Sequence, residues 1–317
     1  MKKTEIIIKA NDAEQTIFKF IKKICPQTSI SIIYKWFRNK DIQVNDQRIN
    51  DRNYIVKIND VIIIYDNNVH IISRGNNIRI LENNKLDIIY EDQNIMIVIK
   101  PHNIEMHNND NDIICMDKKV RSYFAKNAKY NPKRENSFII SSVNRLDKFT
   151  TGLVLYAKNK KALNYFNDII NNKEKVKKYY LAKVEGKFKN SNITVSGFLH
   201  KDATSKKMVF NNKSENDFNK LCETKFKVLV SNKEYSILKI KLITGKKHQI
   251  RATLEFLGHP IWNDQKYSSG HITDNKMIYL YAYILNFGKL DNEFDYLSSK
   301  FFKMKNINSE LNKYLKL

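Results

Sequence analysis

The sequence predicts an α+β protein, in which a small N-terminal α/β domain precedes a larger domain with a mixed, mainly antiparallel sheet flanked by helices. Three observations predict this arrangement. The chain has 317 residues and 42% hydrophobic residues, enough for two packed domains. An Asn-rich connector at residues 76–86 separates two patterned parts. The second part contains mainly short strand-like segments and few helical ones. We therefore expect domains at residues 1–80, with a core at about 13–75, and at 86–317.

In the first domain, residues 30–38 repeat apolar side chains at helical spacing. Ile30, Ile33, Tyr34 and Phe37 fall on one side of this helix, and Lys35 and Arg38 fall on the other. Strands are predicted at residues 41–45, 54–56 and 61–64, with turns at 45–46 and 59–60.

In the second domain, apolar runs and alternating segments predict most of the sheet. We expect strands at residues 86–92, 95–100, 153–158, 176–186, 193–199, 224–230 and 235–243. Helices are expected at residues 160–172 and after Thr244, ending at Gly258. A lysine-rich stretch at residues 201–220 predicts an exposed flap, and the segment from Asp291 is only weakly patterned.

The net charge of +23 and the pI near 9.6 indicate a polyanionic partner, either nucleic acid or an anionic membrane surface. A general enrichment in Lys, Asn and Ile offers a second explanation of this charge. Arginine use is more informative, because after Glu135 the chain retains only Arg145 and Arg251. Where lysine supplies most positive charges, a retained arginine suggests a need for a planar, bidentate and permanently charged group.

The three cysteines, Cys25, Cys115 and Cys222, are far apart and lack zinc-site spacing. We expect reduced thiols, no bound metal, and a cytoplasmic location, or an organellar matrix in a eukaryote. The N-terminus becomes polar too early for a signal peptide, and the longest apolar runs have the length of strands. No membrane span is therefore predicted.

Three side chains in the second domain are candidates for chemistry. Asp147 follows Arg145 in a polar loop that we expect between buried strands at residues 138–140 and 153–158, although such pairs are often solvated and contribute little. Tyr180 points inward from its predicted strand, where a packed and hydrogen-bonded tyrosine is the alternative. Arg251 lies on the predicted helix with His248 one turn before it, and its guanidinium could simply reach solvent.

Residues 29–45 and 58–62 resemble the small RNA-binding fold first described in a ribosomal protein of the small subunit. Asn59 stands where that family usually has Gly, and Asn tolerates the left-handed backbone. The resemblance implies that Lys35, Arg38 and Lys40 face an RNA backbone. A solvated, charged helix is the alternative interpretation.

Three motifs of the second domain resemble the RluA family of RNA pseudouridine synthases. They are Arg145-Leu146-Asp147-x-x-Thr150-Thr151-Gly152, Lys178-x-Tyr180-x-Ala182, and Thr244-Gly245-Lys246-x-His248-Gln249-Ile250-Arg251 with Leu257-Gly258-His259-Pro260. They occur in the family's order within residues 86–287. With the N-terminal unit, the chain is most similar to the RluC/RluD type, which acts on large-subunit ribosomal RNA.

The resemblance implies roles for individual residues. Asp147 would be the nucleophile, and Arg251 would keep it ionised through a bidentate pair. Tyr180 would stack on the target base and help to remove a proton. Arg145 would help to extrude the nucleotide from the RNA. Two further residues, Lys246 and His248, are expected to bind RNA.

The implied reaction isomerises uridine to pseudouridine in large-subunit ribosomal RNA or a pre-ribosomal particle, without a cofactor, and we expect a monomer. A noncatalytic RNA-binding or ribosome-assembly protein on the same scaffold is the alternative. The chain departs from the family pattern at Asn144 (usually His), Thr151 (Ser), Lys246 (Arg) and Asn263 (Gly). None of these departures removes a residue with an implied chemical role.

Overall fold

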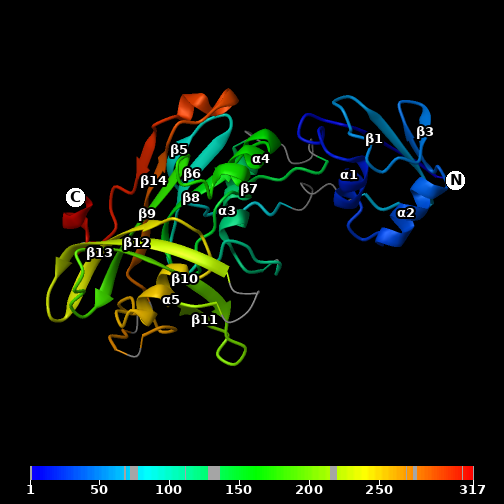
Figure 1. Cartoon of the computed structure of the whole chain (residues 1–317). Coiled ribbons are helices and arrows are strands. Elements are labelled where there is room, and N and C mark those ends of the chain that lie inside the picture. The colour runs from blue at the N-terminus through cyan, green and yellow to red at the C-terminus, as the bar shows by residue number, and fades with distance from the viewer. Residues whose placement is uncertain are drawn as a thin grey trace. The chain divides into compact units, whose positions relative to one another are not determined.

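The computed structural model describes residues 2–67, 69–71, 78–110, 112–127, 136–214, 220–268, 270–273, 277–308 and 310–316 (Figure 1). The chain divides into two compact units. The first comprises Met1–Lys85, Asp117–Ser141 and Ala157–Leu163, and the second comprises Leu86–Met116, Ser142–Tyr156 and Asn164–Leu317. The first unit thus includes two segments from within the predicted range of the second domain.

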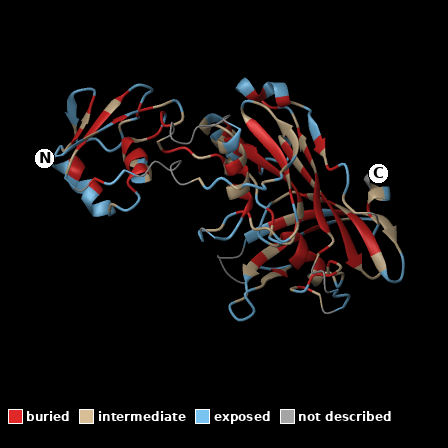
Figure 2. Cartoon of the chain, turned by 180° about the vertical axis from the view of Figure 1, so that it is seen from behind, coloured by how far each residue is buried: buried red, intermediate tan, exposed pale blue. Residues whose placement is uncertain are grey.

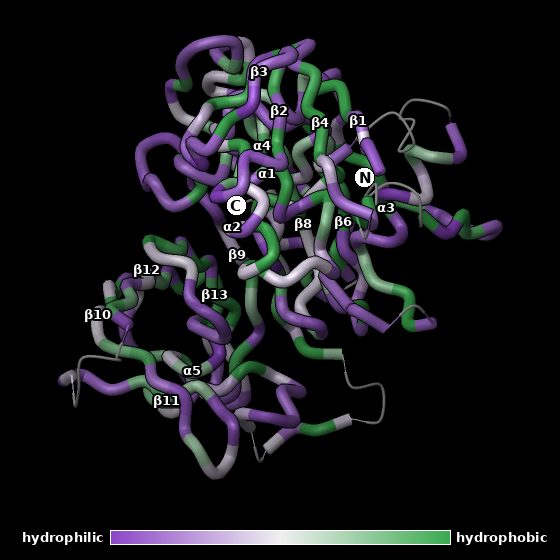
Figure 3. Tube along the Cα trace, turned by 90° about the vertical axis from the view of Figure 1, so that its right-hand side faces the viewer, coloured by the Kyte–Doolittle hydropathy of each residue, from purple (hydrophilic) through white to green (hydrophobic). Residues whose placement is uncertain are grey.

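The first unit contains a four-stranded sheet with the order β1-β4-β2-β3. Its strands are β1 (Lys3–Ile7), β2 (Ile42–Val44), β3 (Gln47–Ile49) and β4 (Val61–Tyr65), accompanied by helices α1 (Ile17–Ile24) and α2 (Ile30–Arg38). Thr16 and Ser29 cap the two helices by accepting hydrogen bonds from backbone amides of the first turn. The continuous apolar sequence of β4 is visible as a hydrophobic strand in Figure 3.

The predicted apolar face of α2 is partly wrong. Ile33, Trp36 and Phe37 are buried, whereas Ile30 and Tyr34 are 44% and 43% exposed. The Tyr34 ring instead stacks on a neighbouring ring and lies under an arginine at the surface. The predicted strand at residues 54–56 is reduced to one isolated bridge. The turn prediction is confirmed, because residues 45, 46 and 59 have positive φ angles.

Most of the strands belong to one eleven-stranded sheet. Its central order is β11-β10-β12-β13-β9-β14-β8-β6-β5, with β15 paired to β14 and β7 paired to β8. The strands are β5 (Asp87–Glu91), β6 (Ile95–Lys100), β7 (Ser141–Ser142), β8 (Thr151–Ala157), β9 (Val176–Glu185), β10 (Asn192–Lys201), β11 (Met208–Asn211), β12 (Lys220–Ser231), β13 (Tyr235–Leu242), β14 (Leu280–Phe287) and β15 (Phe301–Lys303). Neighbouring strands are mainly antiparallel, and β14 and β8 run parallel. The predicted α+β class is confirmed.

The remaining elements of the chain are helices and short 3-10 helices. They are α3 (Met116–Lys126), α4 (Lys160–Ile169), α5 (Gln249–Phe256), η2 (Asn292–Leu297) and η3 (Asn312–Lys316). The central strands are largely buried, as the red ribbons of Figure 2 show. Among the described residues, no helix combines the length and apolar content required to cross a bilayer.

Three local predictions differ from the structure. Helix α5 begins after His248, which has a left-handed backbone, and not after Thr244. The Thr244 hydroxyl instead contacts a glutamine side chain of α5 and the backbone of β12. Residues 138–140 form no strand, although Phe138 and Ile140 are buried. The predicted flap contains strand β11, which pairs with β10; its residues 215–219 lie outside the described residues.

Candidate active site

Asp147 lies in the loop that joins β7 to β8. The Asn144 amide group fixes this loop to β8, because it accepts a hydrogen bond from the Leu155 amide at 2.8 Å and donates one to the Leu153 carbonyl at 3.3 Å. The Thr150 amide donates to the Asp147 carbonyl at 3.1 Å and closes a turn. Asn144 therefore anchors the loop from within, while the Asp147 side chain remains 24% exposed.

A buried lysine at the end of β6 also holds this loop in place. The Lys100 side chain, at the end of β6, is fully buried, and its ammonium donates to the carbonyls of Pro101, Ile104 and Lys148 at 2.8, 2.8 and 2.9 Å. Burial lowers the pKa of Lys100 to about 7, and the Asp147 carboxylate opposes this shift. Lys100 thus ties the end of β6 to the residue that follows Asp147.

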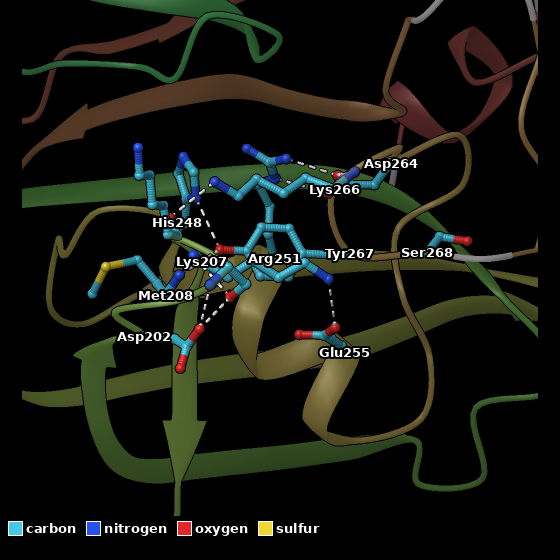
Figure 4. Close-up of polar contacts among 12 residues, drawn as sticks. Asp202, Lys207, Met208, His248, Arg251, Glu255, Asp264, Lys266, Tyr267 and Ser268 are labelled. Atoms are coloured by element: carbon cyan, nitrogen blue, oxygen red, sulfur yellow. Dashed lines mark hydrogen bonds and ion pairs between the residues drawn. The ribbon is translucent and has the colours of Figure 1, made fainter.

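Arg251 approaches Asp147 from helix α5. Its guanidinium is almost fully buried, and Nη1 lies 3.7 Å from Asp147 Oδ2. The bidentate partner of Arg251 is Asp264, with Nε–Oδ2 and Nη2–Oδ1 distances of 2.7 Å each (Figure 4). The expected bidentate pair between Arg251 and Asp147 is therefore wrong. Two of the three guanidinium nitrogens are held by a fully buried carboxylate, which leaves Nη1 to face Asp147.

The electrostatic environment of Asp147 is mixed. Burial raises the pKa of Asp147, whereas the positive charges of Arg251 and Lys247 lower it. The net shift is upward. The site thus holds a carboxyl group whose charged form is less well solvated than in water and is stabilised by nearby cations.

His248 and Tyr267 form a hydrogen-bonded pair beside Asp147. His248 Nδ1 lies 2.9 Å from the Tyr267 hydroxyl oxygen (Figure 4). On the other side of the ring, His248 Nε2 lies 3.7 Å from Asp147 Oδ2. Burial and nearby cations lower the pKa of His248 to about 3, so its ring is neutral at pH 7. The Tyr267 oxygen already accepts a hydrogen bond from the Met208 amide at 3.0 Å. Donation of the Tyr267 proton to Nδ1 favours the tautomer with the imidazole proton on Nε2, on the side of Asp147.

Tyr267 also supports Arg251. The guanidinium carbon lies 4.8 Å from the centroid of the Tyr267 ring, which is a cation–π distance. Burial raises the pKa of Tyr267 to about 12, so the phenol stays protonated at neutral pH. One tyrosine thereby orients both the histidine and the arginine that face Asp147.

A cavity of about 1120 Å³ connects these groups with β9. Tyr180 and Lys178, two residues apart on β9, both line it. Burial and the negative charge of Asp147 raise the pKa of Tyr180 above its ordinary value. The Lys178 ammonium donates to the Ile170 carbonyl at 2.8 Å, and burial lowers its pKa to about 8.

The structure brings together all the candidate residues of the second unit. The cavity is lined by Arg145, Asp147, Tyr180, Lys246, His248 and Arg251. Arg145 and Lys246 are exposed, whereas His248 is enclosed and uncharged, which is unlike a phosphate contact. In the first unit, Lys35 and Arg38 on α2 and the following Lys40 are all exposed.

Four residues of the site were not assigned a role from sequence: Lys100, Lys178, Asp264 and Tyr267. Lys178 gave a usable signal, because it interrupts the inward-facing apolar positions of β9. Lys100 gave a similar one at the end of a continuous apolar strand. Asp264 and Tyr267 lie in a loop without periodicity, so their contacts with α5 could be found only in three dimensions.

Comparisons with known proteins place the chain in a family. A family model described as RNA pseudouridylate synthase matches residues 94–256. An uncharacterised RNA pseudouridine synthase of Mycoplasma capricolum is 44% identical over 298 residues, which cover 94% of this chain and 96% of the relative.

Other relatives match only part of the chain. The mitochondrial tRNA pseudouridine(32) synthase of Saccharomyces cerevisiae is 34% identical over 142 residues, 44% of this chain and 30% of the relative. The ribosomal large subunit pseudouridine synthase D of Borreliella burgdorferi is 31% identical over 160 residues, 50% of this chain and 48% of the relative.

The solved structure of human RNA pseudouridylate synthase domain containing 1 has a TM-score of 0.51 and 20% identity, covering 74% of this chain and 95% of the human chain. This likeness concerns the fold alone. The family match covers more than half of the chain, and the Mycoplasma relative is similar along nearly its whole length. The chain is therefore a member of the RNA pseudouridylate synthase family.

Proposed function

We propose that this chain isomerises uridine to pseudouridine with Asp147 as the nucleophile and without a cofactor. The observation that carries the proposal is the meeting of Asp147, Arg251 and Tyr180 in one cavity, although they lie far apart in sequence. The reaction breaks the bond between uracil and ribose, turns the ring and rejoins it through carbon. It requires neither a redox change nor an energy source.

The cavity has the size of a small-molecule site and can take a nucleotide that has left the RNA stack. The exposed Arg145 at its edge is suited to fill the vacated position in the RNA. Lys246, also exposed and on the same cavity, is suited to contact a phosphate.

Asp147 is placed to attack the anomeric carbon of the ribose, or to promote elimination there. Arg251 stabilises the charged carboxylate through the Nη1 contact, because Asp264 holds the other two nitrogens. The neutral His248 adds an Nε2 proton on the side of Asp147. This arrangement favours the ionised form of Asp147 against the opposing effect of burial, without locking its oxygens in a bidentate pair.

Tyr180 remains a protonated phenol at neutral pH because its pKa is raised. Its buried ring is suited to stack on the uracil. Its hydroxyl is suited to relay the proton released when the new carbon–carbon bond has formed, rather than to act as a phenolate.

For the substrate we propose large-subunit ribosomal RNA, bound as free RNA or as a pre-ribosomal particle. The partial similarity to a ribosomal large subunit synthase supports it. So does the resemblance of residues 1–80 to a small RNA-binding domain, which we propose as a separate domain before the catalytic residues 86–317. Transfer RNA is the second candidate, because a tRNA synthase matches a similar share of the chain.

The experiment that tests the proposal uses total RNA from cells that lack this protein. Purified wild type and Asp147→Ala are incubated with separated ribosomal and transfer RNA, and pseudouridine is detected with a uridine-specific chemical probe. We expect new sites in large-subunit ribosomal RNA with wild type only. Sites in transfer RNA alone would move the assignment to the second candidate. If wild type adds no modification that the variant lacks, the enzyme proposal fails.

A further inference from the structure

The large sheet has a second face that does not border the cavity. Successive side chains of a strand point to opposite faces. Lys178 and Tyr180 of β9 line the cavity, so Lys177 and Tyr179 lie on the other side of the same sheet. We refer to this side as the back face.

Four lysines occupy adjacent positions on the back face. Antiparallel pairing places Lys241 of β13 opposite Tyr179. Pairing of β13 with β12 places Lys225 opposite Lys241, and Lys227 opposite Lys239. Directly paired residues point to the same face, so these four lysines share the back face with Tyr179. We call Lys225, Lys227, Lys239 and Lys241 the back-face lysine group.

More positive charge surrounds this group. Ile284 of β14 pairs with both Tyr179 and Lys303, which extends the basic surface to β15. Burial and the charges of Lys227 and Lys303 lower the pKa of Lys239. Burial and the charges of Lys177, Lys225 and Lys173 likewise lower the pKa of Lys241.

Such an arrangement is unfavourable for the free protein, because like charges directly opposite each other destabilise a sheet. Glu223 of β12 lies two residues before Lys225 and shares its face, so it offsets part of this positive charge. Glu185 of β9 already accepts hydrogen bonds from the Ser268 hydroxyl and the His271 amide. A lysine-rich composition can supply a lysine at any exposed position, but it does not favour opposed pairs. A polyanion bound across the strands would offset their repulsion.

We propose that the back-face lysine group binds the phosphate backbone of a substrate RNA, at a segment distant from the nucleotide that enters the cavity. This inference rests on the proposed function, since it takes RNA as the substrate. Phosphate contacts of this kind supply affinity and orientation without reading sequence. The Tyr179 ring, 5.6 Å from the Lys239 ammonium, adds an aromatic surface beside the lysines.

The position of the back-face lysine group indicates how long the substrate RNA must be. The cavity and the lysines are on opposite faces of one sheet. A single RNA molecule can reach both only if it continues around an edge of the sheet. A short stem-loop that enters the cavity cannot do so, whereas a long, folded RNA can.

The test compares two RNAs and two variants. Lys225→Gln/Lys227→Gln/Lys239→Gln/Lys241→Gln removes the group. Lys187→Gln/Lys189→Gln/Lys233→Gln/Lys313→Gln removes the same charge from exposed lysines outside it. Filter binding measures the affinity of each protein for full-length large-subunit ribosomal RNA and for a short uridine-containing stem-loop, between about 50 and 200 mM salt.

We expect the back-face variant to bind the long RNA roughly tenfold more weakly at low salt and with a smaller salt slope. Its affinity for the stem-loop should match wild type, and the control variant should change little with either RNA. Unchanged affinity for the long RNA would overturn the proposal. So would an equal loss in both variants, or an equal loss for both RNAs. If the fourfold variant does not fold, Lys225→Gln/Lys227→Gln, at two exposed positions, answers the same question with a smaller effect.

This result is separate from the test of catalysis. Wild type that forms no pseudouridine would remove the proposed reaction, but the two binding curves would still show whether the lysine group holds RNA. Conversely, unchanged binding in the back-face variant would leave the reaction at Asp147 untouched.

Discussion

Two aspartates face the same guanidinium, and their surroundings differ. Asp264 is fully buried and accepts two hydrogen bonds of 2.7 Å from Arg251. Asp147 is 24% exposed and lies 3.7 Å from the remaining nitrogen, with a raised pKa. The comparison suggests a division of roles, in which Asp264 fixes the arginine while Asp147 stays available to a substrate.

Of the two aspartates, Asp264 should have the larger effect on stability when it is replaced. Asp264→Asn leaves the buried Arg251 charge without its carboxylate, which should cost about 3–5 kcal/mol in the free energy of unfolding. Thermal unfolding should show a Tm lower by roughly 10 °C. Glu234→Gln, at an exposed carboxylate, serves as the control and should leave the Tm unchanged. A wild-type Tm for Asp264→Asn would contradict the structural role.

Tyr180→Phe separates stacking from proton transfer. The ring remains, so KM should change little, while loss of the hydroxyl should lower kcat by about a hundredfold. Steady-state kinetics of pseudouridine formation measure both values. Tyr235→Phe, a tyrosine of β13 away from the cavity lining, should behave as wild type. An unaltered kcat for Tyr180→Phe would exclude a role for the hydroxyl.

A smaller effect is expected from Tyr267→Phe, which removes the hydrogen bond to His248 Nδ1 and retains the ring under Arg251. The histidine can then adopt either tautomer, and kcat should fall by about tenfold. Nitrogen chemical shifts of the His248 ring provide the direct measurement. They should report the Nε2-protonated form in wild type and a mixture in the variant. The same single tautomer in both proteins would show that Tyr267 does not set it.

The smallest effect concerns stability against pH. The pKa of Asp147 is higher in the folded protein than in the unfolded chain, where it is near 3.8. The contribution of Asp147 to stability is therefore greatest below pH 3.8, and it is lost as the pH rises toward and through the pKa of the folded state. The Tm of Asp147→Asn should therefore equal that of wild type in acid. Above the pH range between the two pKa values, it should exceed that of wild type by about 1–4 °C. Activity of wild type should rise over the same window as Asp147 ionises. A variant that is less stable than wild type at neutral pH would show that Asp147 is stabilising.

Sequence patterns predicted the elements that present one clear periodicity. Strand β9 and helix α4 agree with their expected ranges, because alternating spacing in β9, interrupted only at Lys178, and helical spacing in α4 mark most of their length. Helix α5 starts later than predicted, since Thr244 is engaged by Gln249 and β12 instead of capping the helix. Helix α3 was not predicted, because five of its eleven residues are charged and few of its side chains are apolar.

The site could be predicted only in part for a related reason. Motifs identified Asp147, Tyr180 and Arg251, but they could not show how one arginine divides its nitrogens between two acids. That division depends on Asp264, which follows Arg251 by a turn and a loop and carries no periodic signal. The role of His248 was also hidden, because its neutral state results from burial beside Arg251 and Lys247.

The most direct test of the central claim is single-turnover pseudouridine formation by Asp147→Asn, on the RNA that wild type modifies, with thermal unfolding recorded on the same sample. The account predicts no product together with a Tm equal to or above that of wild type, because an amide keeps the shape but cannot act as the nucleophile. Product formation by this variant would contradict the account. A loss of product that accompanies a lowered Tm would contradict it as well, since Asp147 would then be a structural residue.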